Sequence, residues 1–213
     1  MTSLRYDGIT AWSESPIMDR ADHATLEDLE AGLDAIRGSP KDNGLLQMIV
    51  CRPCVDARTV LQEATLDPTE GLVGDTWSTR QNARTSDGSP DPDTQLTLMN
   101  SRVIELVARE RDRWPLAGDQ LYVDFDLSDE NLPPGTRLSI GTAVIEVTEQ
   151  PHTGCNKFKA RFGADAVKFV NSVAGRRLKL RGINAKVVQP GSIRVADIVR
   201  KLRGSSSGQR VHG

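Results

Sequence analysis

The side chains best suited to chemistry in this chain are its three cysteines and three histidines, and Cys155 is the strongest candidate among them. A proline and a glycine close before it predict an irregular path that can project the thiol into a cleft. His152 precedes the thiol, while Lys157 and Arg161 follow it. A free thiol titrates near ~8.5, and cationic neighbours lower that value. The neighbouring charges therefore favour thiolate over thiol, whereas the spacing alone leaves a reactive thiol and a buried, inert cysteine as equal alternatives.

Cys51 and Cys54 form a Cys-x-x-Cys motif after an apolar run. Such a motif can be a redox pair, or it can supply two of the four ligands of a structural zinc ion. A second motif of this kind is absent from the sequence, so only Cys155 and a histidine remain to complete a zinc site. We interpret the motif as two ordinary thiols at the end of a strand.

Two glycine-aspartate pairs form a second focus, Gly74 with Asp75 and Gly118 with Asp119. Glycine lets the backbone approach a ligand closely, and a carboxylate accepts hydrogen bonds. Ordinary tight turns have the same composition. Basic residues gather over 157–201, which predicts either a solvated face or a site for a small phosphate-bearing ligand.

Overall charge and composition exclude several classes of function. The chain has 213 residues and a net charge of -2, which gives no field for nucleic acid or an anionic membrane. We see no apolar run long enough to span a bilayer and no secretory signal. The odd number of cysteines argues against a disulfide framework. We therefore expect a cytoplasmic protein.

The elements expected to position these residues are mostly short strands. Apolar residues at spacings of three and four predict one amphipathic helix over 24–36. Strands are expected over 45–50, 94–98, 121–127, 137–147 with a hinge near Gly141, and 183–188, with 58–64 as an antiparallel partner or a short helix. Further helices are expected over 101–111, capped by Asn100, and over 164–173, with a helical turn over 195–202 and a surface loop over 78–93.

In this order the motifs resemble the MOSC family, the C-terminal domain of molybdenum cofactor sulfurases and its free-standing bacterial relatives. The resemblance runs from residue 45 to about 201 and includes Gly-Leu-Val-Gly-Asp at 71–75, Thr-Gln-Leu-Thr-Leu at 94–98, Ala-Gly-Asp at 117–119, the thiol at Cys155 and the segment 181–193. It implies a mainly β fold with short helices, closed into a MOSC-type barrel over 41–203. Residues 1–40 would then be an N-terminal helical extension, and 204–213 a flexible tail.

The resemblance also implies a cofactor, because Cys155 takes the place of the family's characteristic cysteine. That thiolate would coordinate the molybdenum of a pterin cofactor, and the free-standing relatives suggest reduction of N-hydroxylated small molecules with the help of an electron-transfer partner. Cations would bind the pterin phosphate, with Lys157, Arg161 and Arg181 as the candidates. The full cofactor-binding set expected is Gly74, Asp75, Gly118, Asp119, His152, Lys157, Arg161 and Arg181.

Two alternatives use the same barrel differently. In the first, Cys155 carries persulfide sulfur delivered by a separate pyridoxal-phosphate-dependent desulfurase, since this chain is too short to contain such a domain. In the second, the protein is a binding module without turnover, consistent with departures from the family pattern such as Thr76-Trp77 after the first glycine-aspartate pair.

Overall fold

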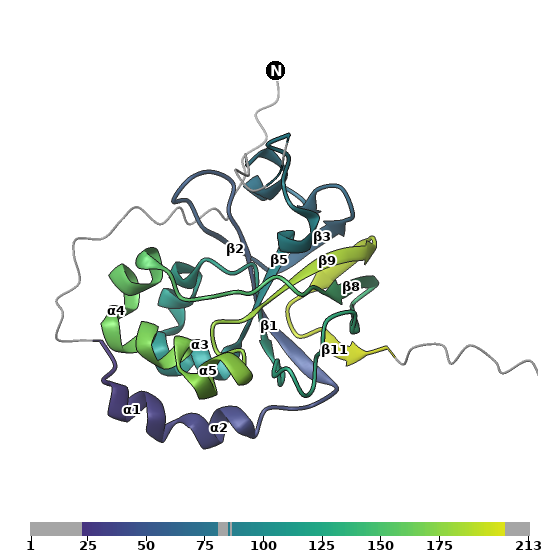
Figure 1. Cartoon of the computed structure of the whole chain (residues 1–213). Helices are drawn as coiled ribbons and strands as arrows, with labels where there is room; N and C mark the ends of the chain where they lie inside the picture. Colours follow the sequence, from purple (N-terminus) through teal and green to yellow (C-terminus); the bar gives the residue numbers. More distant parts are fainter. Residues whose placement is uncertain (1–22, 81–84, 86, 203–213) are drawn as a thin grey trace, which may run out of the picture.

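Seven strands close into a barrel in the computed structural model, which describes residues 23–80, 85 and 87–202 (Figure 1). Around the barrel the strands are β1 (Gly44–Cys51), β6 (Leu121–Asp124), β5 (Leu96–Asn100), β9 (Ile183–Gln189), β8 (Ala143–Val147), β7 (Arg137–Ile140) and β11 (Ile198–Lys201). The ring closes because β1 pairs with β6 on one side and with β11 on the other. The pair β5 and β6 is parallel, and the other neighbouring strands of the ring are antiparallel.

The remaining strands extend the barrel at one end. β2 (Thr59–Leu61) pairs antiparallel with the end of β1, which confirms one of the two structures expected for that segment. A separate three-stranded sheet joins β10 (Gly191–Arg194), β3 (Glu63–Asp67) and β4 (Gly71–Leu72). The mainly β, closed-barrel fold predicted from the sequence is confirmed.

Alternating side chains fill the barrel. In β8 the buried residues Ala143, Ile145 and Val147 alternate with half-buried ones, as the period of two requires. Leu98 and Leu121, which face each other across the parallel pair, are also completely buried in this core. An apolar barrel interior leaves its rim and its outer surface as the places for chemistry.

Five helices gather on one side of the barrel, on the left of Figure 1. A second apolar core lies between them and the outer surface of the barrel, and includes Phe158, Phe162 and Tyr122. The helices are α1 (Leu26–Ala31), α2 (Leu33–Arg37), α3 (Ser101–Ala108), α4 (Asn156–Asn171) and α5 (Val173–Arg177). Short 3-10 turns are η2 (Thr76–Thr79), η3 (Pro92–Thr94) and η4 (Arg111–Ala117).

Three helical predictions need correction. The single helix over 24–36 is divided at Gly32, where a larger side chain would collide with Leu106 of α3. The helix expected over 164–173 begins already at Asn156 and is kinked at Gly163, whose φ is 89°. The helix expected over 101–111 is capped by Asn100 as predicted, but it ends at Ala108 because Arg109 leaves the helical conformation with a positive φ of 63°.

The helical turn expected over 195–202 is wrong, because this segment contains β11. Val199 pairs with Gly44 of β1 and with Ile140 of β7, so tertiary pairing decides its conformation. Residues 1–22 of the expected extension and the tail 204–213 lie outside the described residues. Within the part that is described, no helix combines the length and the apolar character that crossing a membrane requires.

Candidate functional site

Cys155 occupies the N-cap position of α4, immediately after the loop that leaves β8. Its side chain is exposed. Partial burial raises the pKa of the thiol, but the backbone N–H groups of Phe158 and Lys157 and the charge of Arg181 outweigh that effect, so the pKa lies below its usual value. A helix N-terminus stabilises an anion in this way. The thiolate character expected from the sequence therefore has a structural cause.

The loop before Cys155 is fixed by side-chain amides at two points. Asn171, at the end of α4, accepts a hydrogen bond from the N–H of Gly154 at 3.0 Å and donates one to its carbonyl at 3.2 Å. Asn184 of β9 donates to the carbonyl of Gln150 at 3.1 Å. Neither asparagine was predicted from the sequence, because no local motif marks them. Together they set the position of the thiol relative to the barrel.

His152, Asp119 and Arg181 form a polar group behind this loop, in which Asp119 and Arg181 are buried and His152 is half-buried. Arg181 donates to Asp119 Oδ2 at 2.7 Å and to the carbonyl of Ala117 at 2.9 Å, and its guanidinium stacks over the ring of Phe158. His152 Nδ1 lies 3.5 Å from Asp119 Oδ1. Burial, followed by the charge of Arg181, lowers the pKa of His152 to about 4, so its imidazole is neutral at physiological pH.

This buried group contains three polar atoms without a hydrogen-bond partner among the described residues. They are Asp119 Oδ1, His152 Nδ1 and Arg181 Nε. A buried polar atom without a partner is uncommon in a folded protein and usually marks a place for water, an ion or a ligand. Arg181 also influences the pKa of Cys155. The structure thus brings His152 and Arg181 together around Asp119, and the charge of Arg181 acts on the thiol.

Asp75 belongs to a second buried pair, with Arg52. Its carboxylate accepts four hydrogen bonds, from the N–H, Nε and Nη2 of Arg52 and from the N–H of Trp77, at 2.8–2.9 Å. Arg52 also donates to the carbonyl of Gly118 at 3.0 Å. One arginine therefore connects the two glycine-aspartate turns that the sequence singled out. Because all these contacts are internal, Asp75 serves the framework and is closed to a ligand.

Gly74 and Gly118 have φ values of 87° and 88°, a region that favours glycine. A Cβ atom at either position would only touch its nearest neighbour, Cys51 Sγ or an Arg58 nitrogen, each at 3.8 Å. Both glycines are therefore explained by the turns they form.

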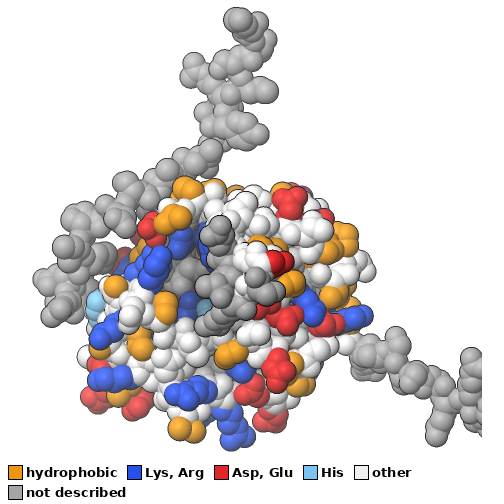
Figure 2. Space-filling view, turned by 45° about the horizontal axis from the view of Figure 1, so that its top comes forward, with side chains coloured by type: hydrophobic (Ala, Val, Ile, Leu, Met, Phe, Trp, Pro, Cys, Tyr) orange, Lys and Arg blue, Asp and Glu red, His pale blue; other side chains and the backbone are white. Residues whose placement is uncertain are grey.

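Cations without a close carboxylate partner among the described residues line the outer part of the site. We call Arg58, Lys157 and Arg161 the outer cluster. Asp56 is the carboxylate nearest to two of them, 3.7 Å from Lys157 Nζ and 3.8 Å from Arg161 Nη2. Figure 2 looks onto the end of the molecule drawn at the top of Figure 1, and Lys and Arg side chains gather there beside a hollow. Arg58 is a further residue that the sequence analysis missed.

The two cysteines of the Cys-x-x-Cys motif have different environments. Cys51 is buried, and burial followed by the charge of Asp75 raises its pKa to about 11. Cys54 is exposed on the loop that follows. In the described part of the chain, His, Cys, Asp and Glu side chains form no group of three that could hold a metal ion. The motif therefore gains no support as a zinc site or as an activated redox pair.

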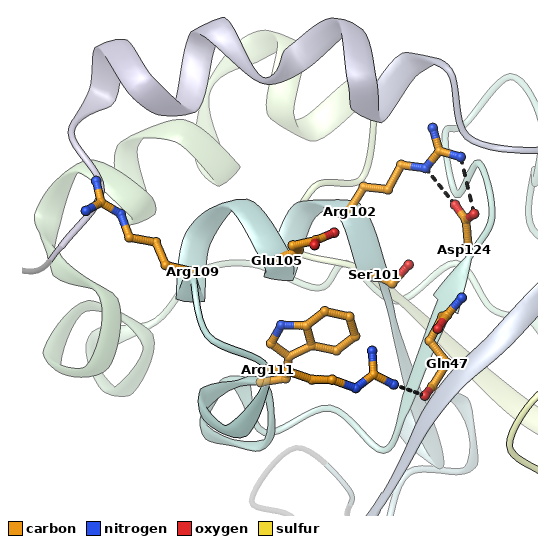
Figure 3. A pocket seen from close by; sticks show the side chains of 8 residues that line it. Gln47, Ser101, Arg102, Glu105, Arg109, Arg111 and Asp124 are labelled. Carbon is orange, nitrogen blue, oxygen red and sulfur yellow. Dashed lines mark hydrogen bonds and ion pairs between the residues drawn. The ribbon is translucent and has the colours of Figure 1, made fainter.

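A pocket of about 380 Å³ lies elsewhere, over α3 and the start of η4 (Figure 3). Its guanidinium groups are engaged: Arg102 binds Asp124 at 2.7 Å, and Arg111 donates to the carbonyl of Gln47 at 2.6 Å. Arg111 also stacks on Trp114. The residues lining it are Gln47, Ser101, Arg102, Glu105, Arg109, Arg111, Trp114 and Asp124, and they include neither a thiol nor an imidazole. We therefore place the candidate site at Cys155.

Solved structures with a similar fold exist. The YuaD protein from Bacillus subtilis is 15% identical with a TM-score of 0.55, over 76% of this chain and 97% of that one. A hypothetical protein is 19% identical with a TM-score of 0.53, over 80% and 72% of the two chains. YiiM from Escherichia coli is 20% identical with a TM-score of 0.49, over 75% and 70%.

A search among curated proteins found no match. The model of the MOSC domain matches residues 85–200, which is more than half of the chain and includes Cys155, Asp119 and Arg181. This chain belongs to the MOSC domain family.

Proposed function

We propose that this protein binds a molybdenum–pterin cofactor through the thiolate of Cys155 and reduces N-hydroxylated small molecules. The observation that carries the proposal is the exposed thiol at the start of α4, whose pKa is lowered by backbone N–H groups and by Arg181. Thiolates are soft ligands that suit molybdenum, and one protein thiolate leaves the other metal positions to the cofactor and the substrate.

The surroundings of the thiol fit such a group. The unpartnered atoms of Asp119, His152 and Arg181 offer both acceptor and donor capacity next to the loop of Cys155. The buried pair of Arg52 and Asp75 makes the adjacent turns rigid. A polar cofactor at the thiol would therefore lie against a charged and fixed framework.

The expected cations differ in their freedom to bind the pterin phosphate. Arg181 is held by Asp119 at 2.7 Å and can offer only its remaining N–H groups. Lys157 and Arg161 have a carboxylate partner only at 3.7–3.8 Å. We therefore assign the fixed cation Arg181 to the resident cofactor, while Lys157 and Arg161 stay available to a second anion.

The overall reaction consumes two electrons and two protons, converting R–NH–OH into R–NH2 and water. When bound, the molybdenum cofactor supplies the two-electron redox chemistry. The electrons come from an electron-transfer protein. In this scheme the protein's own residues bind and orient the substrate, and neutral His152 provides a hydrogen-bonding nitrogen near the thiol without adding charge.

The exposure of Cys155 also supports a second candidate, a sulfur carrier. Its thiolate would attack the outer sulfur of a desulfurase persulfide, forming Cys155–S–SH and releasing the desulfurase thiolate. Accessibility and a lowered pKa are what this exchange requires.

Elemental analysis of protein produced in a host that makes the cofactor separates these functions. We expect molybdenum close to stoichiometric in the wild type and in the control Cys54→Ser, and almost none in Cys155→Ser. A mass increase of one sulfur at Cys155 without molybdenum would favour the carrier. Neither molybdenum nor added sulfur, against clear loading of a positive-control family member, would contradict both and leave a binding module.

A further inference from the structure

The outer cluster holds more positive charge than its surroundings balance. Among the described residues, Asp56 is the one carboxylate within 4 Å of a cluster cation, and it lies at 3.7–3.8 Å from Lys157 and Arg161. Arg161 has one further hydrogen bond, to the carbonyl of Leu116. The half-buried guanidinium of Arg58 donates to the carbonyl of Ala57, and its buried Nε has no partner in the described part of the chain.

The positive charge of Arg58 is destabilised by its surroundings. Burial, followed by the charges of Arg161 and Arg52, lowers the pKa of Arg58. Like charges held together in a partly buried place destabilise one another unless an anion joins them. A bound anion would relieve this repulsion and would also supply an acceptor for the unpartnered Nε.

The inner arginines differ from the outer cluster. Arg52 and Arg181 are buried and held by carboxylates at 2.7–2.8 Å. The cluster residues are more open, with 71% of the Lys157 side chain and 24% of the Arg161 side chain exposed, and their contacts to Asp56 are loose. The fixed inner ion pairs suit a cofactor that stays bound. The outer cluster can give up its loose contacts to Asp56 when a ligand enters and form them again when the ligand leaves.

We propose that Arg58, Lys157 and Arg161 form a subsite for a phosphate monoester or a similar dianion carried by the substrate. This rests on the proposed function, because it assigns the substrate class of the same site. Guanidinium groups bind phosphate oxygens through paired N–H donors, and an ammonium group adds a point charge. Lys157 and Arg161 lie on the first turns of α4, the helix that Cys155 caps, so a phosphate held there leaves the rest of the substrate near the thiol.

Calorimetric titration of the metal-free protein with inorganic phosphate and with a nucleoside monophosphate, at constant ionic strength, tests the subsite. We expect Arg58→Gln and Arg161→Gln to weaken binding of both probes by roughly tenfold or more. The matched control is Lys159→Gln, an exposed cation on the same helix, which should bind like the wild type. Equal affinities for all four proteins would overturn the proposal. Arg58→Lys keeps the positive charge at this position and should therefore retain part of the phosphate affinity that Arg58→Gln loses.

The same titration on cofactor-loaded protein shows whether the subsite binds the substrate or the cofactor's own phosphate. Unchanged phosphate affinity after loading supports a substrate subsite. Loss of phosphate binding on loading would mean that the cofactor's own phosphate fills the cluster, and would overturn the assignment to substrate. The metal-free measurement needs no molybdenum, so failure of the proposed function and failure of the subsite give different results.

Discussion

Replacing Asp75 by Asn would remove the charge that holds the framework of the site together. The Asp75 side chain is completely buried and accepts four hydrogen bonds, three of them from Arg52. An asparagine keeps the size but loses the charge, and its NH2 group would face N–H donors. Arg52 would then be a buried cation without a counterion.

Breaking one side of a buried ion pair costs about 3–5 kcal/mol. For a domain of this size each kcal/mol lowers Tm by about 2–4 °C, so we expect a decrease of roughly 6–20 °C. The exposed pair of Asp34 and Arg37 provides the control, because the Asp34 side chain is 92% exposed. Asp34→Asn should change the free energy of unfolding by less than about 1 kcal/mol.

Urea unfolding followed by tryptophan fluorescence measures both variants. A double variant, Arg52→Met with Asp75→Leu, removes both charges and should recover a substantial part of the stability lost in Asp75→Asn, because replacing a buried pair by apolar groups is often nearly neutral. A free energy of unfolding for Asp75→Asn within about 1 kcal/mol of Asp34→Asn would refute the role assigned to this pair.

Three further predictions concern the thiol and its loop. In the metal-free protein, alkylation followed by mass spectrometry should modify Cys155 with a pH midpoint below that of an unperturbed thiol and leave Cys51, whose pKa is about 11, unmodified at neutral pH; equal rates for the two cysteines would contradict the assigned environments. Because the pKa of His152 is about 4 in the folded state against 6.5 ordinarily, the unfolded chain binds a proton first as the pH falls. Stability should therefore be full above about pH 6.5 and decline towards pH 4 by at most about 3 kcal/mol, a decline that His152→Gln should flatten in urea titrations. Asn171→Ala removes two hydrogen bonds to Gly154 and should cost about 1–3 kcal/mol, with faster amide exchange at Gly154; unchanged exchange would show that the loop is held by other contacts.

Local patterns in the sequence predicted much of the barrel. The alternation in β8, the turn at Gly141 and the cap at Asn100 each depend on neighbouring residues, so their signals are visible in a short segment. β11 was missed because its conformation depends on pairing with β1 and β7, far away in the chain. Ile198 and Val199 are β-branched and favour a strand, but the segment is only four residues long, and the closing of the barrel decides the structure.

The candidate site was predicted in part. The sequence identified the carboxylates Asp75 and Asp119 but could not give their partners, because Arg52 and Arg181 lie 23 and 62 residues away along the chain. For the same reason it treated Asp75 as a ligand residue, although its oxygens are already used. Arg58 was missed because an isolated arginine in a loop carries no pattern.

X-ray absorption at the molybdenum edge tests most directly whether Cys155 holds the metal. The wild type and Cys54→Ser, each loaded with cofactor, should show one more sulfur neighbour around molybdenum than any cofactor retained by Cys155→Ser. An identical sulfur count in all three loaded proteins would contradict the assignment of Cys155 as the metal ligand.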